Sequence, residues 1–358
     1  YLLPYYNFDK ILSDDFFNGS LAFTSSGNNN LNNTNQLKSS IINDFSYRSL
    51  EYITRSGFSN NIDINLKNLN SIGKNSEYKS SPQSEIVSIF SFNSSIPLQK
   101  SKDEFETLLT PKVSLRINPS DMKNYSSSSK KINVGNIFNI NRLGISDTYE
   151  AGRSLTIGFD YKKEKINNKQ SEQKKELENI NKYFELKLAT VIRDKEENFI
   201  PKSSTLNRKN SNYFGSIDTQ ISENFKVEYD FALDNNLKEL QYNNLISTIK
   251  FGDFETKFNF IEENGEMGDS NVLENSLLYN FDESNSLAFN TRRNRKLNLT
   301  EYYDLIYEYK NDCLTAGVKY KKTYYADRDV KPTENLLFTV TLFPLTTYEY
   351  NVDELVNN

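Results

Sequence analysis

The feature that most constrains the fold of this chain is an alternation of apolar and polar side chains that recurs in one segment after another. Within Phe225–Leu233 every second residue is apolar, and Lys226, Glu228 and Asp230 fall between them. The same alternation runs through Phe254–Ile261 and Asp312–Tyr324. Since successive side chains of a strand point to opposite faces, each segment has one apolar and one polar face. Segments of about 10 residues with this pattern, joined by turns, are typical of a membrane β-barrel with lipid outside and water inside.

The pattern predicts about 17 or 18 antiparallel strands. In the second half of the chain they are Tyr183–Ile192, Tyr213–Ile221, Phe225–Leu233, Tyr242–Phe251, Phe254–Ile261, Val272–Asn280, Leu287–Asn294, Thr300–Tyr309, Asp312–Tyr324 and Asn335–Phe343. Upstream candidates are Ser20–Thr24, Leu37–Tyr47, Ile62–Leu66, Glu85–Asn93, Leu108–Asn118, Ile132–Ile140 and Leu155–Tyr161. Two polar stretches, Ser120–Lys131 and Lys162–Lys182, interrupt the rhythm.

The connections between the predicted strands alternate between short and long. Short turns include Gly252-Asp253 and Lys310–Asp312, and longer polar loops include Glu262–Asn271 and Ala326–Glu334. Outer-membrane barrels have short periplasmic turns and longer external loops, whereas a soluble sandwich has no reason to sort its loops in this way. The charged insert Lys162–Lys182 falls on the short-turn side, where we expect a periplasmic excursion.

Composition narrows the possible functions. No run approaches the ~18 apolar residues that a membrane helix needs, and the low mean hydropathy is compatible with a barrel whose strands half face water. There is no histidine and one cysteine, so we expect no catalytic, metal or cofactor site. A net charge of −5 argues against a nucleic-acid partner. The chain begins at Tyr1 without a signal peptide, and we expect a fragment of a longer precursor.

Two further features are candidate sites with more than one interpretation. Cys313 opens a strand directly after a short turn. It is either a lone small apolar residue or one half of a disulfide formed in an oxidising compartment with a cysteine outside this sequence. Arg292, Arg293, Arg295 and Lys296 form a basic run beside a predicted external loop. That run is either a solvated loop cluster or a contact for anionic lipid headgroups.

Several motifs resemble one known family. They include Asn311-Asp312-Cys313-Leu314-Thr315-Ala316-Gly317, Asn141-Arg142-Leu143-Gly144 and Gly152-Arg153-Ser154-Leu155. Together with Leu109-Thr110-Pro111 and the end of the chain, they resemble the C-terminal barrel of the LPS-assembly outer-membrane protein family, LptD. Leu3-Pro4-Tyr5-Tyr6 would then fall in an earlier strand. The resemblance implies a very large barrel in the cell outer membrane, preceded by a periplasmic domain and first strands that are absent here.

The resemblance also implies a function and partners. In the family the barrel inserts lipopolysaccharide into the outer leaflet through a lateral exit, is plugged by the lipoprotein LptE, and continues a periplasmic lipopolysaccharide bridge. Cys313 matches a family cysteine that forms a disulfide to the periplasmic domain. We therefore expect a barrel over residues 1–345 and a periplasmic tail over 346–358, with no enzymatic activity. Alternatives are a passive porin-like channel and a soluble β-rich binding or adhesin module.

The predicted last strand, Asn335–Phe343, is the part of the exit that this sequence can supply. Its expected lipid-facing residues are Leu336, Phe338, Val340 and Leu342. Pro344 lacks an N–H, so it would end this strand and limit hydrogen bonding at the edge.

Overall fold

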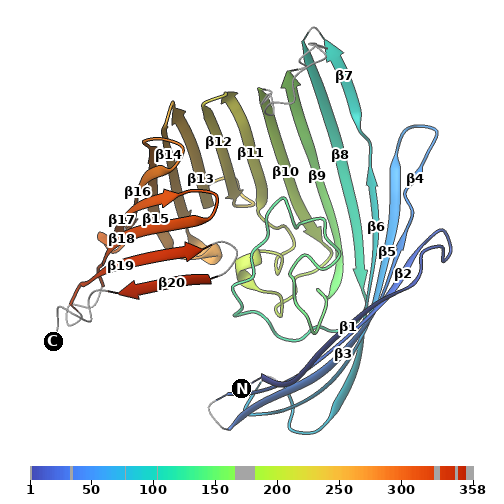
Figure 1. Cartoon of the computed structure of the whole chain (residues 1–358). Coiled ribbons are helices and arrows are strands. Elements are labelled where there is room, and N and C mark those ends of the chain that lie inside the picture. Colours follow the sequence, from blue (N-terminus) through green and yellow to red (C-terminus); the bar gives the residue numbers. More distant parts are fainter. Residues whose placement is uncertain are drawn as a thin grey trace.

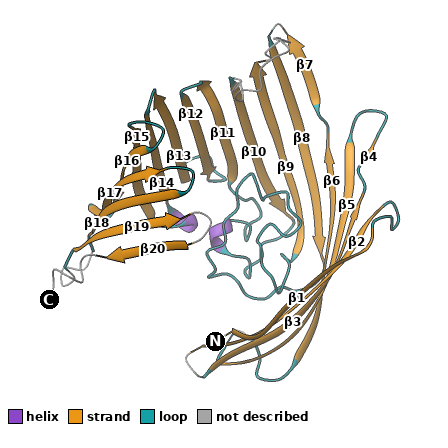
Figure 2. Cartoon of the chain, in the orientation of Figure 1, coloured by secondary structure: helices purple, strands orange, loops and turns teal. Residues whose placement is uncertain are grey.

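The computed structural model describes residues 2–32, 35–76, 78–102, 104–165, 182–325, 331–342 and 346–351. Over these residues the chain forms one antiparallel sheet of 20 strands, which curls around a group of connecting segments (Figure 1). The described helices are two 3-10 turns, η1 (Lys202–Ser204) and η2 (Gly265–Met267), and strands make up most of the rest (Figure 2). In the part of the chain that is described, no helix has the length and apolarity to cross a membrane.

The strands follow one another around the sheet in chain order. They are β1 (Leu2–Ser13), β2 (Gly19–Asn32), β3 (Gln36–Ser49), β4 (Tyr52–Ile53), β5 (Ser59–Lys74), β6 (Gln83–Ser95), β7 (Leu98–Lys102), β8 (Phe105–Asn118), β9 (Gly152–Lys165), β10 (Tyr183–Arg193), β11 (Tyr213–Ser222), β12 (Phe225–Leu233), β13 (Leu240–Phe251), β14 (Phe254–Glu263), β15 (Ser270–Asn280), β16 (Asn285–Asn294), β17 (Leu299–Lys310), β18 (Leu314–Thr323), β19 (Thr333–Leu342) and β20 (Thr346–Asn351).

Each strand pairs antiparallel with the next, except at two short strands. β4 pairs only with β5 and β7 only with β8, so β3 pairs directly with β5 and β6 with β8. Between the described residues of β1 and β20 no ladder forms, so these two strands are the edges of the sheet. The predicted all-β antiparallel fold of the outer-membrane type is confirmed.

The strand register gathers the apolar positions on one face. Leu186 of β10 pairs with Ile217, Ile217 with Tyr229, Tyr229 with Leu245, and Leu245 with Phe260. The adjacent row on the opposite face carries charges, with Glu185 paired with Asp218 and Asp218 with Glu228. Connecting segments cover this second face near β10 to β12, so it is the inner face and the apolar face is the outer one. The alternation therefore has the orientation predicted from the sequence.

Short and long connections lie at opposite ends of the strands. One end, the short-turn end, carries the turns at 223–224, 252–253 and 311–313, and the other, the long-loop end, carries the connections at 119–151 and 194–212. Because Tyr183 pairs with Glu164 and with Gln220, the connection between β9 and β10 lies at the short-turn end, as predicted. Most of the charged insert, residues 166–181, lies outside the described residues.

Some predicted elements were wrong. Residues Ile132–Ile140 form no strand but belong to the connection between β8 and β9. Asn133 bends the chain there, because its side-chain oxygen accepts from the N–H groups of Gly135 and Asn136. The count of about 17 or 18 strands was too low, because besides β20 it omitted β4, which is two residues long, and β7, Leu98–Lys102, which is too polar to show the alternation.

The end of the chain also differs from the prediction. Asn335–Phe343 corresponds to β19, but a further strand, β20, pairs with it from Leu342↔Thr346 to Leu337↔Asn351. β19 is therefore not the last strand, and residues 346–351 are not a tail. The sequence Thr346–Asn351 lacks a long apolar face, and its pairing depends on β19, so alternation alone did not reveal it. Phe343, Pro344 and residues 352–358 lie outside the described residues.

Candidate functional site

The inner face of the sheet is filled on one side by two long connections. Residues 119–151 and 194–212 fold back over the inner face of β10 to β12, inside the curve of the sheet (Figure 1). Their apolar side chains bury those of the strands beneath them, and Ile137, Ile200 and Leu206 are fully buried. The resulting core contains Met122, Ile132, Ile137, Leu143, Ile145, Ala151, Ala189, Val191, Ile200, Leu206, Phe214, Ala232 and Met267. We call β5 to β12 with these two connections the filled sector.

Backbone contacts join the two connections to each other. The N–H of Tyr125 donates to the carbonyl of Phe199 at 2.9 Å, and that of Lys202 donates to Ser126 at 3.3 Å. The hydroxyl of Ser203 donates to the carbonyls of Ser128 and Lys130 at 3.0 and 2.8 Å. Since nearly all buried backbone polar groups need partners, these bonds let irregular chain pack inside the sheet. The connections therefore form a structured inner layer.

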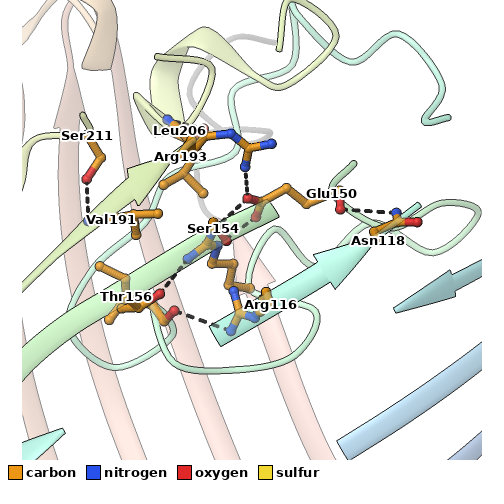
Figure 3. Close-up of polar contacts among 12 residues, drawn as sticks. Arg116, Asn118, Glu150, Ser154, Thr156, Val191, Arg193, Leu206 and Ser211 are labelled. Carbon is orange, nitrogen blue, oxygen red and sulfur yellow. Dashed lines mark hydrogen bonds and ion pairs between the residues drawn. The ribbon is translucent and has the colours of Figure 1, made fainter. Parts of the chain in front are cut away.

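A buried charge cluster fixes this layer to the wall. The carboxylate of Glu150, at the end of the first connection, accepts from Arg142 Nε at 2.6 Å and forms an ion pair with Arg193 of β10 (Figure 3). Arg142 also donates to Thr156 and Ser154 of β9 at 3.0 and 3.1 Å. Glu150 and both arginines are less than one tenth exposed. The Glu150–Arg142 pair thus joins the connection to two neighbouring strands, β10 through Arg193 and β9 through Ser154 and Thr156.

Positive charge exceeds negative charge in this cluster. Arg116 of β8, 2% exposed, donates to the carbonyl of Asn139, while its Nε and Nη1 have no described partner. Arg142 and Arg193 pair with the Glu150 carboxylate, and Arg116 lies nearby, with Glu150 and the buried Asp63 as the neighbouring acids. Burial alone would raise the pKa of Glu150, but the guanidinium groups of Arg142 and Arg193 lower this pKa to about 2.

A second polar network ties the same connection to the N-terminal strands. Asp147 accepts from the hydroxyls of Tyr78 and Tyr125 at 2.8 and 2.5 Å. Lys67 of β5 forms an ion pair with Asp44 of β3 at 2.6 Å, and the Tyr149 hydroxyl donates to Asp44 at 3.4 Å. Burial, followed by the nearby Asp44 charge, raises the pKa of Tyr149. The connection over 119–151 thus contacts the wall from β3 to β9.

The two connections leave the inner face of the last six strands largely uncovered. We call β15 to β20 the open sector. Beyond Val272, Asp304 is the only buried residue among those described. Charged pairs line the inner face here: Arg292 lies between Glu274 and Glu301 at 2.9 and 2.6 Å, and Lys319 lies 3.3 Å from Asp304. The inner wall therefore has a packed half and a hydrated half.

Comparison with known proteins identifies the family. The sequence profile described as LptD, LPS transport system D, matches residues 15–292, well over half of the chain. The chain belongs to the LptD family. It is therefore a component of lipopolysaccharide transport in the outer membrane, from a family of transport proteins rather than enzymes. Among curated proteins, none matches this chain.

Solved porins are similar only at a low level. Two engineered variants of the Rhodopseudomonas blastica porin are 8% and 9% identical, each with a TM-score of 0.33. The matches cover 92% and 98% of this chain and 100% and 99% of the porins. A protein described under asymmetric conductivity of engineered proteins has 9% identity and a TM-score of 0.31, over 88% of this chain and 91% of its own. Scores this low do not define a common fold, and the LptD assignment rests on the sequence profile.

The predicted basic run is divided between the two faces of the sheet. Arg292 points inward to its two carboxylates, and Lys296 forms an ion pair with Asp269. Arg293 pairs with outward Leu273, and the Arg295 guanidinium lies 5.6 Å from the centre of the Phe260 ring. Only Arg293 and Arg295 thus lie on the outer face at the long-loop end, where contact with lipid headgroups stays a prediction.

The other predicted site residues lie in the open sector. Cys313 is exposed in the turn before β18, where its N–H donates to the Asn311 side chain at 3.0 Å. It lies at the short-turn end, and its disulfide stays a prediction. The expected exit residues of β19 share the outer face, since Phe338 pairs with Val318 and Leu336 with Tyr320. These residues, Leu336, Phe338, Val340 and Leu342, lie one strand in from the edge.

The buried cluster was the part that the sequence analysis missed. The cluster joins residues that are far apart in the sequence, namely Arg116, Glu150 and Arg193. The residues around each of them do not indicate the other two. A signal did exist, because Arg116 and Arg193 occupy inward positions near the ends of their strands, directly before the two longest connections. An inward arginine beside a long connection that carries a carboxylate predicts such a contact.

Proposed function

We propose that this chain forms the barrel wall through which lipopolysaccharide is inserted into the outer leaflet, and that the glycolipid leaves sideways at an edge of the sheet. Membership of the LptD family supports lipopolysaccharide as the molecule that is transported. The observation that supports a sideways route is the inner layer of residues 119–151 and 194–212, which occupies the filled sector. A glycolipid has acyl chains that need lipid and sugars that need water, so a lateral opening in a hydrated barrel serves both.

The edge strand β20 is the proposed side of the exit, in place of β19. It is six residues long and pairs on one side only among the described strands. A short edge strand has few ladder hydrogen bonds to break, which matters because each unpaired backbone group in lipid costs several kcal/mol. The uncovered inner face of β15 to β20 leaves space for the plug lipoprotein LptE. Periplasmic bridge proteins would reach the barrel through a domain outside this sequence.

A covalent lock tests the lateral exit. In a Cys313→Ser background, a cysteine at Thr347 of β20 would be crosslinked to a cysteine on the opposing strand of the full-length barrel. Export of lipopolysaccharide to the cell surface should stop on crosslinking and recover on reduction. The matched control crosslinks the inner-face pair Thr248 and Lys257, which oppose each other on β13 and β14. Export that continues with the β20 seam closed would contradict the lateral exit and favour a passive channel.

A further inference from the structure

The outer face of the first strands departs from the apolar pattern seen elsewhere. A continuous row of hydroxyl and amide side chains crosses five strands, which we call the polar row: Tyr6, Ser25, Asn43, Asn68 and Ser84. The Tyr6 hydroxyl lies 3.1 Å from that of Ser25, which donates to Asn43 at 2.7 Å. Asn43 donates to Asn68 at 3.4 Å, and Asn68 donates to Ser84 at 3.3 Å. Each side chain in the row thus forms a hydrogen bond with the next side chain.

The polar row marks one limit of the apolar outer surface. One outward position nearer the short-turn end, the residues are Phe23, Phe45 and Leu66, and the last two are more than two fifths exposed. Two residues along a strand correspond to about 7 Å. Across β2, β3 and β5 the surface thus changes from aromatic and aliphatic to polar within one such step, while Phe8 of β1 and Ile86 of β6, which pair with Ser25 and Asn68, stay apolar and exposed. The change occurs toward the long-loop end, the end that faces the cell exterior in outer-membrane barrels.

A hollow of about 520 Å³ lies directly beyond the polar row. Its outward side chains include Tyr6, Asn29, Ser39, Ile41 and Asn70. Ser39 donates to Asn29 at 2.6 Å and Asn70 donates to Asn68 at 2.7 Å, so the polar groups are held in place. None of the described residues that line the hollow is charged, although one quarter of the chain is.

A glycine shapes the floor of this hollow. Gly27 pairs with Tyr6 across the strands, and a Cβ on Gly27 would lie 2.2 Å from the Tyr6 ring. The glycine therefore allows the tyrosine ring to lie against the sheet. A flat aromatic face, an aliphatic neighbour in Ile41 and fixed amides and hydroxyls are now adjacent on one surface.

This combination matches an uncharged sugar. Hydroxyl and amide groups both donate and accept, as sugar hydroxyls do, and an aromatic ring offers an apolar face to the C–H groups of a pyranose. The volume lies within the range of about 300–1,000 Å³ that is usual for ligand sites. The described residues that line the hollow include no arginine or lysine, and so no group that would select a phosphate or carboxylate.

We propose that the hollow beside the polar row binds neutral sugar units of lipopolysaccharide on the outer wall of the barrel. This inference rests on the proposed function. The apolar surface at Phe23, Phe45 and Leu66 faces the acyl chains of the same molecule. The hollow begins at the polar row and reaches the next outward positions, Gly27, Ile41 and Asn70, about 14 Å along the strands from that apolar surface, on the side where the saccharide begins. The wall thus holds both parts of an amphipathic cargo in register.

Saturation-transfer NMR on the full-length protein in lipid nanodiscs tests the proposal, with a short neutral oligosaccharide of glucose and galactose as the probe. The wild type should transfer saturation to the sugar ring protons. Asn70→Ala should weaken binding about fivefold to tenfold through loss of hydrogen bonds. Gly27→Ala should weaken it similarly without removing a polar group, because it displaces the Tyr6 ring. The matched control Asn275→Ala, on the outer face of β15, should leave binding unchanged.

Three results would overturn the proposal: no saturation transfer with the wild type, equal binding by Asn70→Ala and the wild type, or a preference for an oligosaccharide that carries phosphate. Heat-modifiable migration on gels confirms that each variant is folded. Binding and export are measured separately. Sugar binding without any effect of the β20 crosslink on export would remove the lateral exit alone, and export without sugar binding would remove this inference alone.

Discussion

The filled and open sectors of the sheet are built from strands of the same kind but differ in how the charged groups on their inner faces find partners. In the filled sector, Glu150 and three arginines are buried beneath ordered connections. In the open sector, Arg292, Glu274 and Glu301 form pairs of similar geometry, with side chains 30–40% exposed. Water solvates the second set, whereas the first depends on its protein partners. The same ionic chemistry is therefore structural in one half and nearly dispensable in the other.

The largest expected effect is from Glu150→Gln. It leaves Arg142 and Arg193 buried without a counter-charge, and breaking a buried pair costs about 3–5 kcal/mol. Glu274→Gln in the open sector is the matched control and should cost at most about 1 kcal/mol. Urea unfolding in detergent micelles, monitored by far-UV circular dichroism, compares the free energies of unfolding of the two variants. Equal losses would break the distinction between the sectors.

Acid should affect the filled sector selectively. Because the folded-state pKa of Glu150 is about 2, below its ordinary value of 4.5, its contribution to stability is complete above about pH 4.5. That contribution, about 3 kcal/mol, is lost as the pH falls through about 2. Hydrogen bonds from Asn285 and from the N–H of Ser284 also lower the pKa of Asp282, but this turn carboxylate is fully exposed.

Proteolysis between pH 5 and pH 2 with an acid-active protease provides the measurement. Cleavage within residues 119–151 should begin as the pH approaches 2. Cleavage at the exposed turn around Asp282 should not change when the Asp282 carboxylate is protonated. Protection of 119–151 that persists unchanged at pH 2 would show that Glu150 does not hold the connection in place.

Within the filled sector, the outer face should reject charge more strongly than the inner face. Leu186→Arg places a cation among the outward residues that pair across β10 to β14, at a cost of about 2–4 kcal/mol near the bilayer midplane. Glu228→Arg on the inner face should be much milder, since that side chain is 40% exposed. Folding yields into lipid vesicles test the pair, and similar yields for both variants would reverse the assignment of the faces.

The smallest expected effect on the barrel concerns Cys313. It is exposed in a turn of the open sector, so Cys313→Ser should change the stability of this sheet by less than about 0.5 kcal/mol. In the full-length protein it should nonetheless abolish a disulfide and shift migration on non-reducing gels. A variant that migrates like the wild type would leave Cys313 as a lone thiol.

Sequence alone located most strands because each alternating segment carries its own signal. β12 matches its predicted bounds, and β10 and β11 each extend one residue beyond theirs. Elements that depend on contacts with distant parts of the chain were not predicted from the sequence. Ile132 and Ile137 cover β10 to β12 instead of forming a strand, and β20 depends on β19. The Glu150 cluster joins residues from three strands and a connection, so the inward arginines before the two long connections indicate a buried contact but do not specify which carboxylate they meet.

The most direct test of the difference between the filled and open sectors is the labelling of matched serine-to-cysteine variants in a Cys313→Ser background. Ser204→Cys places a thiol in the filled sector at a fully buried position in η1, and Ser276→Cys places one on the half-buried inner face of β15. Both proteins would be exposed to a small water-soluble maleimide in nanodiscs. The Ser276→Cys thiol should react readily and the Ser204→Cys thiol only after unfolding. Equal reactivity of the two folded variants would contradict a packed inner layer on one side of the lumen.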